Sequence, residues 1–311
     1  MAVHHHMQHV RTSDLSGFNP HRARGIALIL VMWLLVLITI LIGTFAVLAR
    51  SENLEARNAF DSVRARAAAE AALHRAAFEM RNPDLETKWT ADGRVYRFLL
   101  GDAEVALSII DETGKIDINS ASGEDLAQLL ESQGVSPDEA LSIADAIQDW
   151  RDGDNLPRPQ GAEADDYEAA GYAYTPRDGP FSTVEELQQV LGVGYQLYNQ
   201  IEPAITVFSG RATSNPAFAP REALLAMGLS EEEAVAFIEQ REAQEGAART
   251  PLELPDGTAV VAQGGGLTYS IVARATLPNG AFSDLRATIR LGTDFVGRPF
   301  RIVRWQEGEY R

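Results

Sequence analysis

An acidic segment in the middle of the chain has the residue types and spacing to bind a metal ion. Residues 149–168 contain seven carboxylates and only two basic side chains, Arg151 and Arg158. Two prolines stiffen the backbone of this segment, and two glycines permit tight bends. Calcium takes about six to eight oxygen ligands from carboxylates and backbone carbonyls, so this arrangement suits a hard cation. A purely solvated acidic loop has the same composition, and the residues alone leave both interpretations open.

Other site chemistries have little support in the sequence. The chain has no cysteine, and His74 is the only histidine after residue 25, which argues against zinc or copper. The acidic segment begins like an EF-hand but lacks the glutamate at the twelfth position. The common nucleotide-binding and hydrolase motifs are also missing from the sequence. We therefore expect no catalytic residues and no enzymatic activity.

The charge of the chain bears on its partners. The formal net charge is −17, and residues 111–205 contain 20 acidic and four basic residues. Within this stretch, the sequences at 118–122 and 191–194 resemble helix-hairpin-helix modules of DNA-uptake proteins. Each phosphate contact needs a compensating positive charge, which this surface lacks. We expect no nucleic-acid partner, and a helix-hairpin-helix nucleic-acid-binding protein of a DNA-uptake system remains an alternative function.

The N-terminal region predicts a membrane anchor behind a short basic leader. The 24 residues 26–49 carry no charge, and as a helix they span ~36 Å, more than the ~30 Å hydrocarbon core. The run is too long for a secretory signal, and the preceding arginines favour a cytoplasmic N-terminus. Because residues 50–81 are alanine-rich and lack proline and glycine, the helix is expected to continue through them. One face of this second half is expected to pack on the rest of the chain: Phe60, Val63, Ala67 and Ala71.

The remaining sequence predicts strands separated by a long helical insertion. Alternating apolar residues and turn signals predict strands at these ranges: 96–100, 104–111, 269–275, 285–291 and 300–305. Helical segments lie between the second and third of these strands, and residues 122–125 predict the start of a helix. The predicted fold class is α+β, with a long N-terminal helix packed on a small antiparallel sheet and a large inserted all-α domain.

The start of the long helix, Arg-Gly-Ile-Ala-Leu, resembles the type IV pilin superfamily. The resemblance implies that a prepilin peptidase cuts between Gly25 and Ile26 and that the new amine of Ile26 is methylated. Members usually have glutamate as the fifth mature residue, and here that residue is Leu30. In the family this glutamate pairs with the N-terminal amine of the subunit above it. Because an unpaired carboxylate is costly in lipid, leucine suits a subunit that has nothing above it.

The plan of the whole chain is similar to the K-type minor pseudopilin family of the type II secretion system (general secretion pathway protein K). The most specific features are the missing glutamate at the fifth position, the sequence at 117–122 and the acidic segment at 149–167. The resemblance implies a subunit at the tip of the pseudopilus. It would initiate and cap assembly with the other minor pseudopilins, for export of folded proteins across the outer membrane. A minor pilin of a type IV pilus remains a second alternative.

The same resemblance implies a location, partners and a cofactor. The chain would cross the inner membrane once, with its N-terminus in the cytoplasm and its bulk in the periplasm. Its partners would be the minor pseudopilins of types I, J and H, the major pseudopilin, the prepilin peptidase and the inner-membrane assembly platform. K-type pseudopilins bind calcium in the acidic segment. Carried over residue by residue, the candidate ligands of a structural calcium ion are Asp149, Asp152, Asp154, Glu163, Asp165, Asp166 and the carbonyl of Leu156.

These expectations divide the chain into consecutive segments. The first three are the prepilin leader at 1–25, the transmembrane helix at 26–49 and the periplasmic half of the long helix at 50–81. The rest are the first part of the pilin-like sheet at 82–118, the inserted helical domain with the metal-binding loop at 119–205, a second helical block at 206–262 that resembles SAM or helix-hairpin-helix modules, and the C-terminal strands of the sheet at 263–311.

Overall fold

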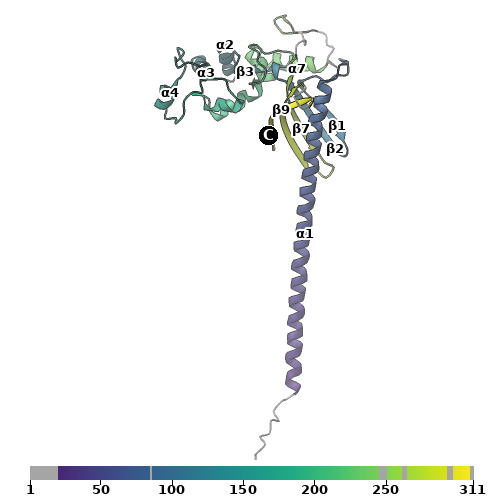
Figure 1. Ribbon diagram of the computed structural model, residues 1–311. Helices are drawn as coiled ribbons and strands as arrows, with labels where there is room; N and C mark the ends of the chain where they lie inside the picture. Colours follow the sequence, from purple (N-terminus) through teal and green to yellow (C-terminus); the bar gives the residue numbers. More distant parts are fainter. Residues whose placement is uncertain (1–19, 85, 245–250, 261–264, 293–296, 309–311) are drawn as a thin grey trace, which may run out of the picture. The chain divides into compact units, whose positions relative to one another are not determined.

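The computed structural model describes the following parts of the chain, with the backbone only for residues 20–26: residues 20–84, 86–244, 251–260, 265–292 and 297–308. The chain forms two compact units, Met1–Phe60 and Asp61–Arg311. Helix α1 (Pro20–Met80) contributes residues to both units (Figure 1). The prediction that the apolar helix continues well beyond residue 49 is confirmed.

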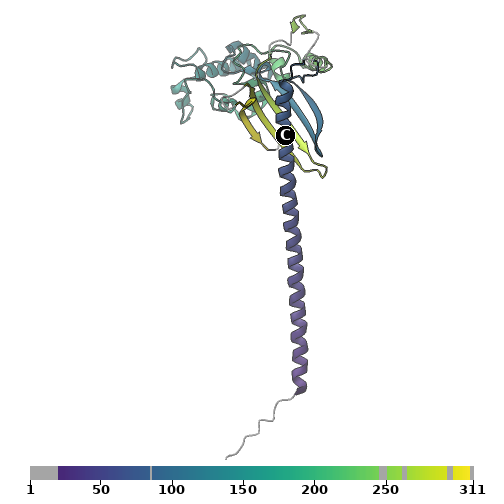
Figure 2. The same ribbon diagram turned by 45° about the vertical axis from the view of Figure 1, so that its right-hand side comes forward.

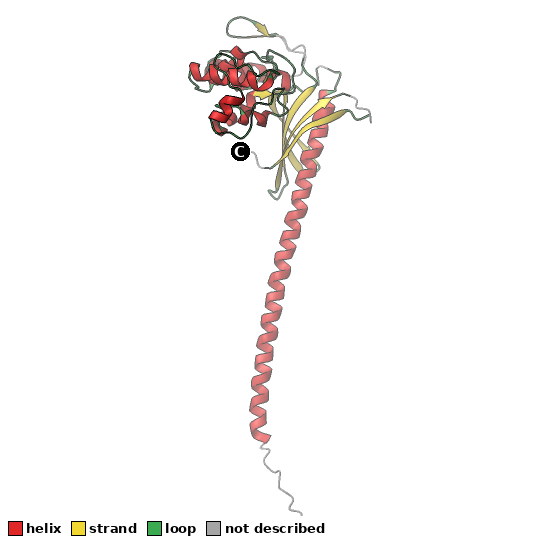
Figure 3. Ribbon diagram, turned by 60° about the vertical axis from the view of Figure 1, so that its left-hand side comes forward, coloured by secondary structure: helices red, strands yellow, loops and turns green. Residues whose placement is uncertain are grey.

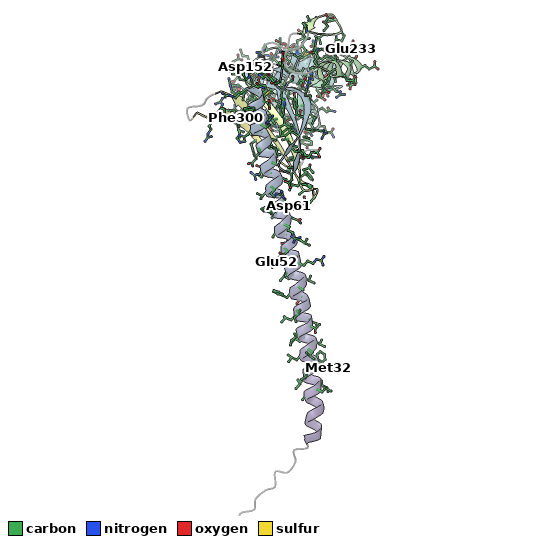
Figure 4. The ribbon with its side chains drawn as sticks, turned by 90° about the vertical axis from the view of Figure 1, so that its right-hand side faces the viewer. Met32, Glu52, Asp61, Asp152, Glu233 and Phe300 are labelled. Atoms are coloured by element: carbon green, nitrogen blue, oxygen red, sulfur yellow. The ribbon has the colours of Figure 1, made fainter. Side chains whose placement is uncertain are left out.

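The first unit contains the apolar part of α1. The helix is long and apolar enough to cross a membrane, and its most apolar 18-residue window has a mean hydropathy of 2.8. None of that window is buried within the chain, and Trp33 and Phe45 are 69% and 72% exposed. Figure 4 shows Met32 and Glu52 projecting outward from the helix. An apolar surface on all sides of a helix is unfavourable in water and favourable in lipid, so this part fits a single membrane span.

The second unit is built around a five-stranded antiparallel sheet. Its strands, in spatial order, are β1 (Asp92–Leu100), β2 (Ala103–Asp111), β7 (Thr268–Thr276), β8 (Phe282–Leu291) and β9 (Phe300–Glu307). Tight turns join β1 to β2 and β7 to β8, and glycines at positive φ occupy both: Gly101 at 62° and Gly280 at 87°. All five predicted strands lie in this sheet, and the predicted α+β class is confirmed.

The C-terminal part of α1 packs on one face of the sheet, as Figures 1 and 2 show from two directions. Val105, Leu107 and Ile109 of β2 alternate with more exposed residues and are fully buried in this core, as predicted for a half-buried strand. The buried apolar positions on α1 recur at helical spacing and are mostly alanines, which let helix and sheet approach closely. They are Ala65, Ala69, Ala72, Leu73, Ala76, Ala77 and Met80.

The face of α1 predicted to pack on the rest of the chain is wrong. Phe60 and Val63 are 65% and 64% exposed, and Ala67 and Ala71 are exposed as well. Alanine occurs on every side of this alanine-rich helix, so its periodicity did not distinguish the packed face. The helix buries the face with the smaller residues and leaves the two large apolar side chains outside the core.

A long insertion leaves the sheet after β2 and returns at β7. It begins with η1 (Glu112–Gly114), β3 (Ile116–Asp117), α2 (Gly123–Ser132), α3 (Pro137–Arg151) and α4 (Ala164–Ala169). It continues with η2 (Val184–Gln189), α5 (Tyr195–Ile201), η3 (Glu202–Ala204), β4 (Ile205–Thr206), α6 (Arg221–Ala226), α7 (Glu231–Glu242), β5 (Leu252–Glu253) and β6 (Ala259–Val260). Figure 3 shows its helices gathered beside the sheet.

Helix α2 of the insertion begins where capping chemistry predicts. The Ser122 hydroxyl accepts a hydrogen bond from the Asp125 amide at 3.1 Å, and the Asp125 carboxylate accepts one from the Ser122 amide at 3.2 Å. This reciprocal pair is a capping box and confirms the predicted start of α2. The two helical blocks predicted at 119–205 and 206–262 share one hydrophobic core, to which Leu130, Leu224 and Phe237 all contribute. Their separate bounds stay a prediction.

Buried and half-buried arginines fasten the insertion to the sheet. Arg241 of α7 is 1% exposed and donates to the carbonyls of Asp92, Pro216 and Ala219 at 2.8, 3.2 and 2.9 Å. Arg94 of β1 donates in turn to the carbonyl of Arg241 at 2.8 Å. Hydrogen bonds from a charged donor contribute more than neutral ones, so these contacts hold α7 firmly against the end of β1.

Candidate functional site: the acidic loop of the insertion

The acidic loop starts inside the last turn of α3. Asp149 lies on the buried side of this helix, and its side chain is fully buried. Its neighbour Trp150 stacks on Phe181, with ring centroids 6.2 Å apart, and its indole donates to Glu186 at 3.1 Å. The helix therefore presents Asp149 from a rigid base. Burial raises the pKa of the Asp149 carboxyl above its ordinary value.

Arg158 returns to this helix and pairs with two carboxylates. Its backbone amide donates to Asp149 Oδ2 at 3.1 Å, and its guanidinium Nη1 donates to Asp149 Oδ1 at 3.1 Å. The same Nη1 donates to Asp152 Oδ2 at 2.8 Å. Both oxygens of the buried Asp149 are thereby satisfied, and the loop closes over the end of α3.

Gly161 is required by this closure. A Cβ atom at this position would lie 1.9 Å from Asp149 Oδ2, far inside any allowed contact. The amide of Gly161 donates to the carbonyl of Arg158 at 3.1 Å and forms the turn that places the arginine over Asp149. The chain passes so close to the carboxylate that a side chain at this position would displace it.

Two carboxylate oxygens at the loop have no hydrogen-bond partner in the described structure. They are Asp152 Oδ1 and Glu163 Oε1, and both atoms are buried. Glu163 is 6% exposed as a whole residue. Burial, followed by the nearby charges of Asp149, Asp178, Asp152 and Asp154, raises the pKa of Glu163 to about 7. Unsatisfied anionic oxygens in a buried position are costly, and a bound cation would relieve that cost.

The other predicted ligands have different surroundings. Asp154 is exposed, and its Oδ1 accepts from the amide of Leu156 at 2.9 Å in a local turn. Leu156 is itself 74% exposed. Asp166 Oδ2 accepts from the amide of Glu163 at 2.9 Å and so caps the start of α4, while Asp165 is exposed in the first turn of that helix. The described structure does not gather these groups into a cluster of three or more that could already hold a metal ion.

Arg151, the second basic residue of the segment, turns away from the carboxylates. Its guanidinium donates to the backbone carbonyls of Ile118 and Ala121 and ties α3 to the start of the insertion. Burial, followed by the charge of Arg158, lowers its pKa from the ordinary value. Arg158 is therefore the basic side chain of the segment that forms ion pairs with its carboxylates.

Asp178 belongs to the electrostatics of the site, although it lies outside the acidic segment 149–168. Its charge raises the pKa of Glu163, and its own backbone has φ of 53°, which is rare for a residue other than glycine. The next residue, Gly179, donates its amide to the carbonyl of Trp150 at 3.4 Å. The Arg-Asp-Gly sequence at 177–179 is a turn signal, but only the fold brings this turn to α3.

The acidic loop suits a hard cation because a few of its carboxylate oxygens are buried and unsatisfied. The two unsatisfied oxygens of Asp152 and Glu163, with the negative field of their neighbours, are the chemistry that calcium seeks. No group of three or more carboxylate or histidine side chains in the described part of the chain already converges as a metal cage. The residues fit the cation by charge and by unsatisfied oxygens, and the assignment of individual ligands stays a prediction.

The processing residues of the predicted leader lie at the start of α1. Gly25 and Ile26 fall within the bounds of the helix, but their side chains lie outside the described residues. Leu30, the fifth residue after Gly25, is 65% exposed on the apolar helix. Its exposure to the surroundings of that helix is compatible with lipid contact, and the assigned roles of all three positions stay predictions.

Comparisons with known proteins find similarity to one family, mainly in the inserted domain. Residues 105–210 match the family model for type II secretion system (T2SS), protein K. The chain is 29% identical over 206 residues to type II secretion system protein K of Klebsiella pneumoniae, a match that covers 60% of this chain and 63% of that protein. The protein of the same name from Pectobacterium carotovorum subsp. carotovorum is 36% identical over 77 residues, which cover 25% of this chain and 24% of the relative. The chain thus spans less than two thirds of the length of these relatives.

A solved structure shares the fold of this chain. A chain in the GspK-GspI-GspJ complex of the enterotoxigenic Escherichia coli type 2 secretion system matches with a TM-score of 0.53 and 18% identity. The match covers 84% of this chain and 99% of that chain, and at this identity it establishes a shared fold. The family model covers most of β2 and the insertion as far as the residues just after β4, so it includes the whole acidic loop. Over residues 105–210, and over the 206 residues aligned with the Klebsiella protein, the chain is similar to type II secretion system protein K.

Proposed function

We propose that this chain is the minor pseudopilin at the tip of a type II secretion pseudopilus. It initiates and caps assembly with the other minor pseudopilins, and the filament below it promotes export of folded proteins across the outer membrane. The observation that supports this role is the protein K match over residues 105–210, which lies mainly on the inserted domain and not on the apolar helix. The role uses shape and binding energy, and it requires no catalytic step.

The apolar part of α1 anchors the subunit in this proposal. The prepilin peptidase removes the leader after Gly25, and the new amine of Ile26 is methylated. The N-terminus faces the cytoplasm, because basic residues precede the apolar run, and the second unit lies in the periplasm. A glutamate in place of Leu30 would need an amine from a subunit above it, which the tip position does not provide.

The partners in this proposal are the minor pseudopilins of types I, J and H, the major pseudopilin, the prepilin peptidase and the inner-membrane assembly platform. The related E. coli chain was solved in a complex with GspI and GspJ, which supports types I and J as the direct neighbours. Membrane helices associate through small residues that let their backbones approach, and Gly43 offers such a position, with open space around it.

The insertion serves as the cap, and its attachment suits that role. A cap that prevents further addition of subunits must keep its position against the sheet when the filament is pushed. Arg286 of β8 pairs with Glu202 at 3.1 Å, and Arg304 of β9 pairs with Glu202 at 3.4 Å and with Glu185. Arg241 joins the insertion to β1, and Arg304 joins it to β9, which are the two edge strands of the sheet. These contacts resist rotation of the insertion against the sheet.

Calcium is the cofactor of this proposal, as a structural ion at the acidic loop. Asp152 and Glu163 would hold it through their unsatisfied oxygens, with Asp154 and the neighbouring acids supplying charge and further ligands. When bound, the ion would neutralise the loop and hold it closed. Affinity on the order of 10⁻⁴–10⁻³ M, as in extracellular calcium modules, would be sufficient in the periplasm.

The decisive test is the composition of the complex in cells. The full-length protein with a C-terminal tag is expected to co-purify with the type I and J pseudopilins from detergent-solubilised membranes. Deletion of its gene is expected to abolish export of folded substrates, and a plasmid copy to restore it. Uniform distribution of the protein along pseudopilus shafts would contradict the tip assignment.

A further inference from the structure

Arg158 forms ion pairs with two carboxylates of the acidic loop, one of which is fully buried. Its Nη1 lies between Asp149 Oδ1 and Asp152 Oδ2, at 3.1 and 2.8 Å. Asp149 is fully buried, and the structure pairs its carboxylate with no basic side chain besides Arg158 among the described residues. A buried carboxylate without a counter-charge would be strongly unfavourable, so this pair holds the loop closed without any bound ion.

The same arrangement leaves two carboxylate oxygens of the loop without a hydrogen-bond partner in the described structure. Asp152 uses Oδ2 for Arg158, while its Oδ1 is buried without a partner. Glu163, 6% exposed, has a second such oxygen. The guanidinium of Arg158 thus pairs with Asp149 and with one oxygen of Asp152. It leaves Asp152 Oδ1 and Glu163 Oε1 without a partner. A divalent cation bound at the free oxygens would lie next to Arg158 and repel it.

We propose that Arg158 is a built-in counter-cation that competes with calcium for the carboxylates of this loop. The inference rests on the calcium site proposed above. It gives a role to Arg158, which is not one of the candidate calcium ligands. Arg158 keeps the loop folded in the absence of calcium, and its charge lowers the affinity of the loop for the ion. The arginine is a positioning residue and makes no contact with the metal.

The effect of the Arg158 charge on the calcium affinity of the loop can be estimated and measured. A unit charge a few ångströms from a divalent ion, in surroundings close to water, changes its affinity by a factor on the order of ten. Removal of the Arg158 charge should therefore tighten calcium binding about tenfold. It should also lower the melting temperature of the calcium-free protein, because Asp149 loses its counter-charge. The rise in melting temperature on adding calcium should be larger than in the wild type.

The experiment compares full-length proteins in detergent by calcium titration calorimetry and by thermal melting in EGTA and in calcium. Arg158→Gln removes the charge, and Arg158→Lys keeps it. Arg221→Gln is the matched control, because Arg221 pairs with Glu222 of α6 and Glu231 of α7 and not with the acidic loop. We expect tighter calcium binding and a larger calcium-induced rise for Arg158→Gln alone.

The outcomes separate this inference from the calcium proposal. If the wild type binds calcium and Arg158→Gln binds it equally or more weakly, the competition is refuted and the calcium site stands. If neither protein binds calcium, the calcium site itself is refuted. Should Arg158→Gln be unfolded in EGTA, calcium is expected to refold it, and persistent unfolding in calcium overturns the inference.

Discussion

Glu163 gives the sharpest prediction about the physical chemistry of the loop. Its pKa is raised to about 7 from the ordinary value of 4.5, first by burial and then by the surrounding carboxylates. The folded protein therefore binds this proton more tightly than the unfolded chain does. Between pH 4.5 and about 7 the folded state holds more protons, so the free energy of unfolding falls as the pH rises through this window.

The size of the effect follows from the shift. One pKa unit corresponds to ~1.4 kcal/mol, so a shift of this size makes the calcium-free protein less stable above pH 7 by roughly 3 kcal/mol. Glu163→Gln keeps the shape of the side chain and removes the charge. The variant should be more stable than the wild type at pH 8 in EGTA, and the difference should largely disappear at pH 4.5.

Urea denaturation of the wild type and of Glu163→Gln at several pH values measures this difference directly. Glu168→Gln is the control, because Glu168 is an exposed carboxylate in the same segment and its removal should leave the pH dependence unchanged. Parallel pH profiles of the wild type and Glu163→Gln would refute the reasoning, since they would mean that Glu163 titrates alike in the folded and unfolded states.

Three further predictions concern packing, attachment and processing. Gly161→Ala should destabilise the protein by ~1–3 kcal/mol in urea denaturation, because its Cβ would strike Asp149, whereas Gly153→Ala, with open space around it, should change stability by less than ~0.5 kcal/mol. Arg241→Met should cost ~3–5 kcal/mol, measured by thermal melting, because it removes the buried cation from three backbone carbonyls and from Asp92; a loss below ~1 kcal/mol would contradict the assigned role. Gly25→Leu should leave the precursor uncut, and a mature N-terminus found by mass spectrometry in this variant would refute the predicted cleavage site.

Local signals predicted the elements of the fold, while long-range contacts decided how they pack. The capping residues at Ser122 and the turn at Gly280 act within a few residues, so local sequence predicts the start of α2 and the strands β7 and β8. The packed face of α1 could not be identified in the same way. Phe60 and Val63 are the larger apolar residues, yet the sheet selects the alanine face because it allows a closer approach.

At the candidate site, too, the sequence predicted local features, while long-range contacts decided the environment of each carboxylate. The composition of residues 149–168 predicted an acidic loop, and the fold places it at the end of α3. The different environments of Asp149 and Glu163 could not be predicted, because they depend on Arg158 returning to the helix and on the turn at Gly161. Asp178 was missed because it is ten or more residues away from the segment and reaches it only through the packing of Gly179 against Trp150.

The acidic residues of the insertion therefore cannot be treated as one charged surface. Some pair with arginines of the sheet, as Glu202 does with Arg286, and these fix the insertion in place. Others, such as Asp125 and Asp166, begin helices and are satisfied by backbone amides. Net charge counts all of them equally, whereas a cation coordinates directly only those oxygens that the fold has left unsatisfied. In the acidic loop, the unsatisfied oxygens of the described structure are Asp152 Oδ1 and Glu163 Oε1. The calcium site must be tested at these two atoms.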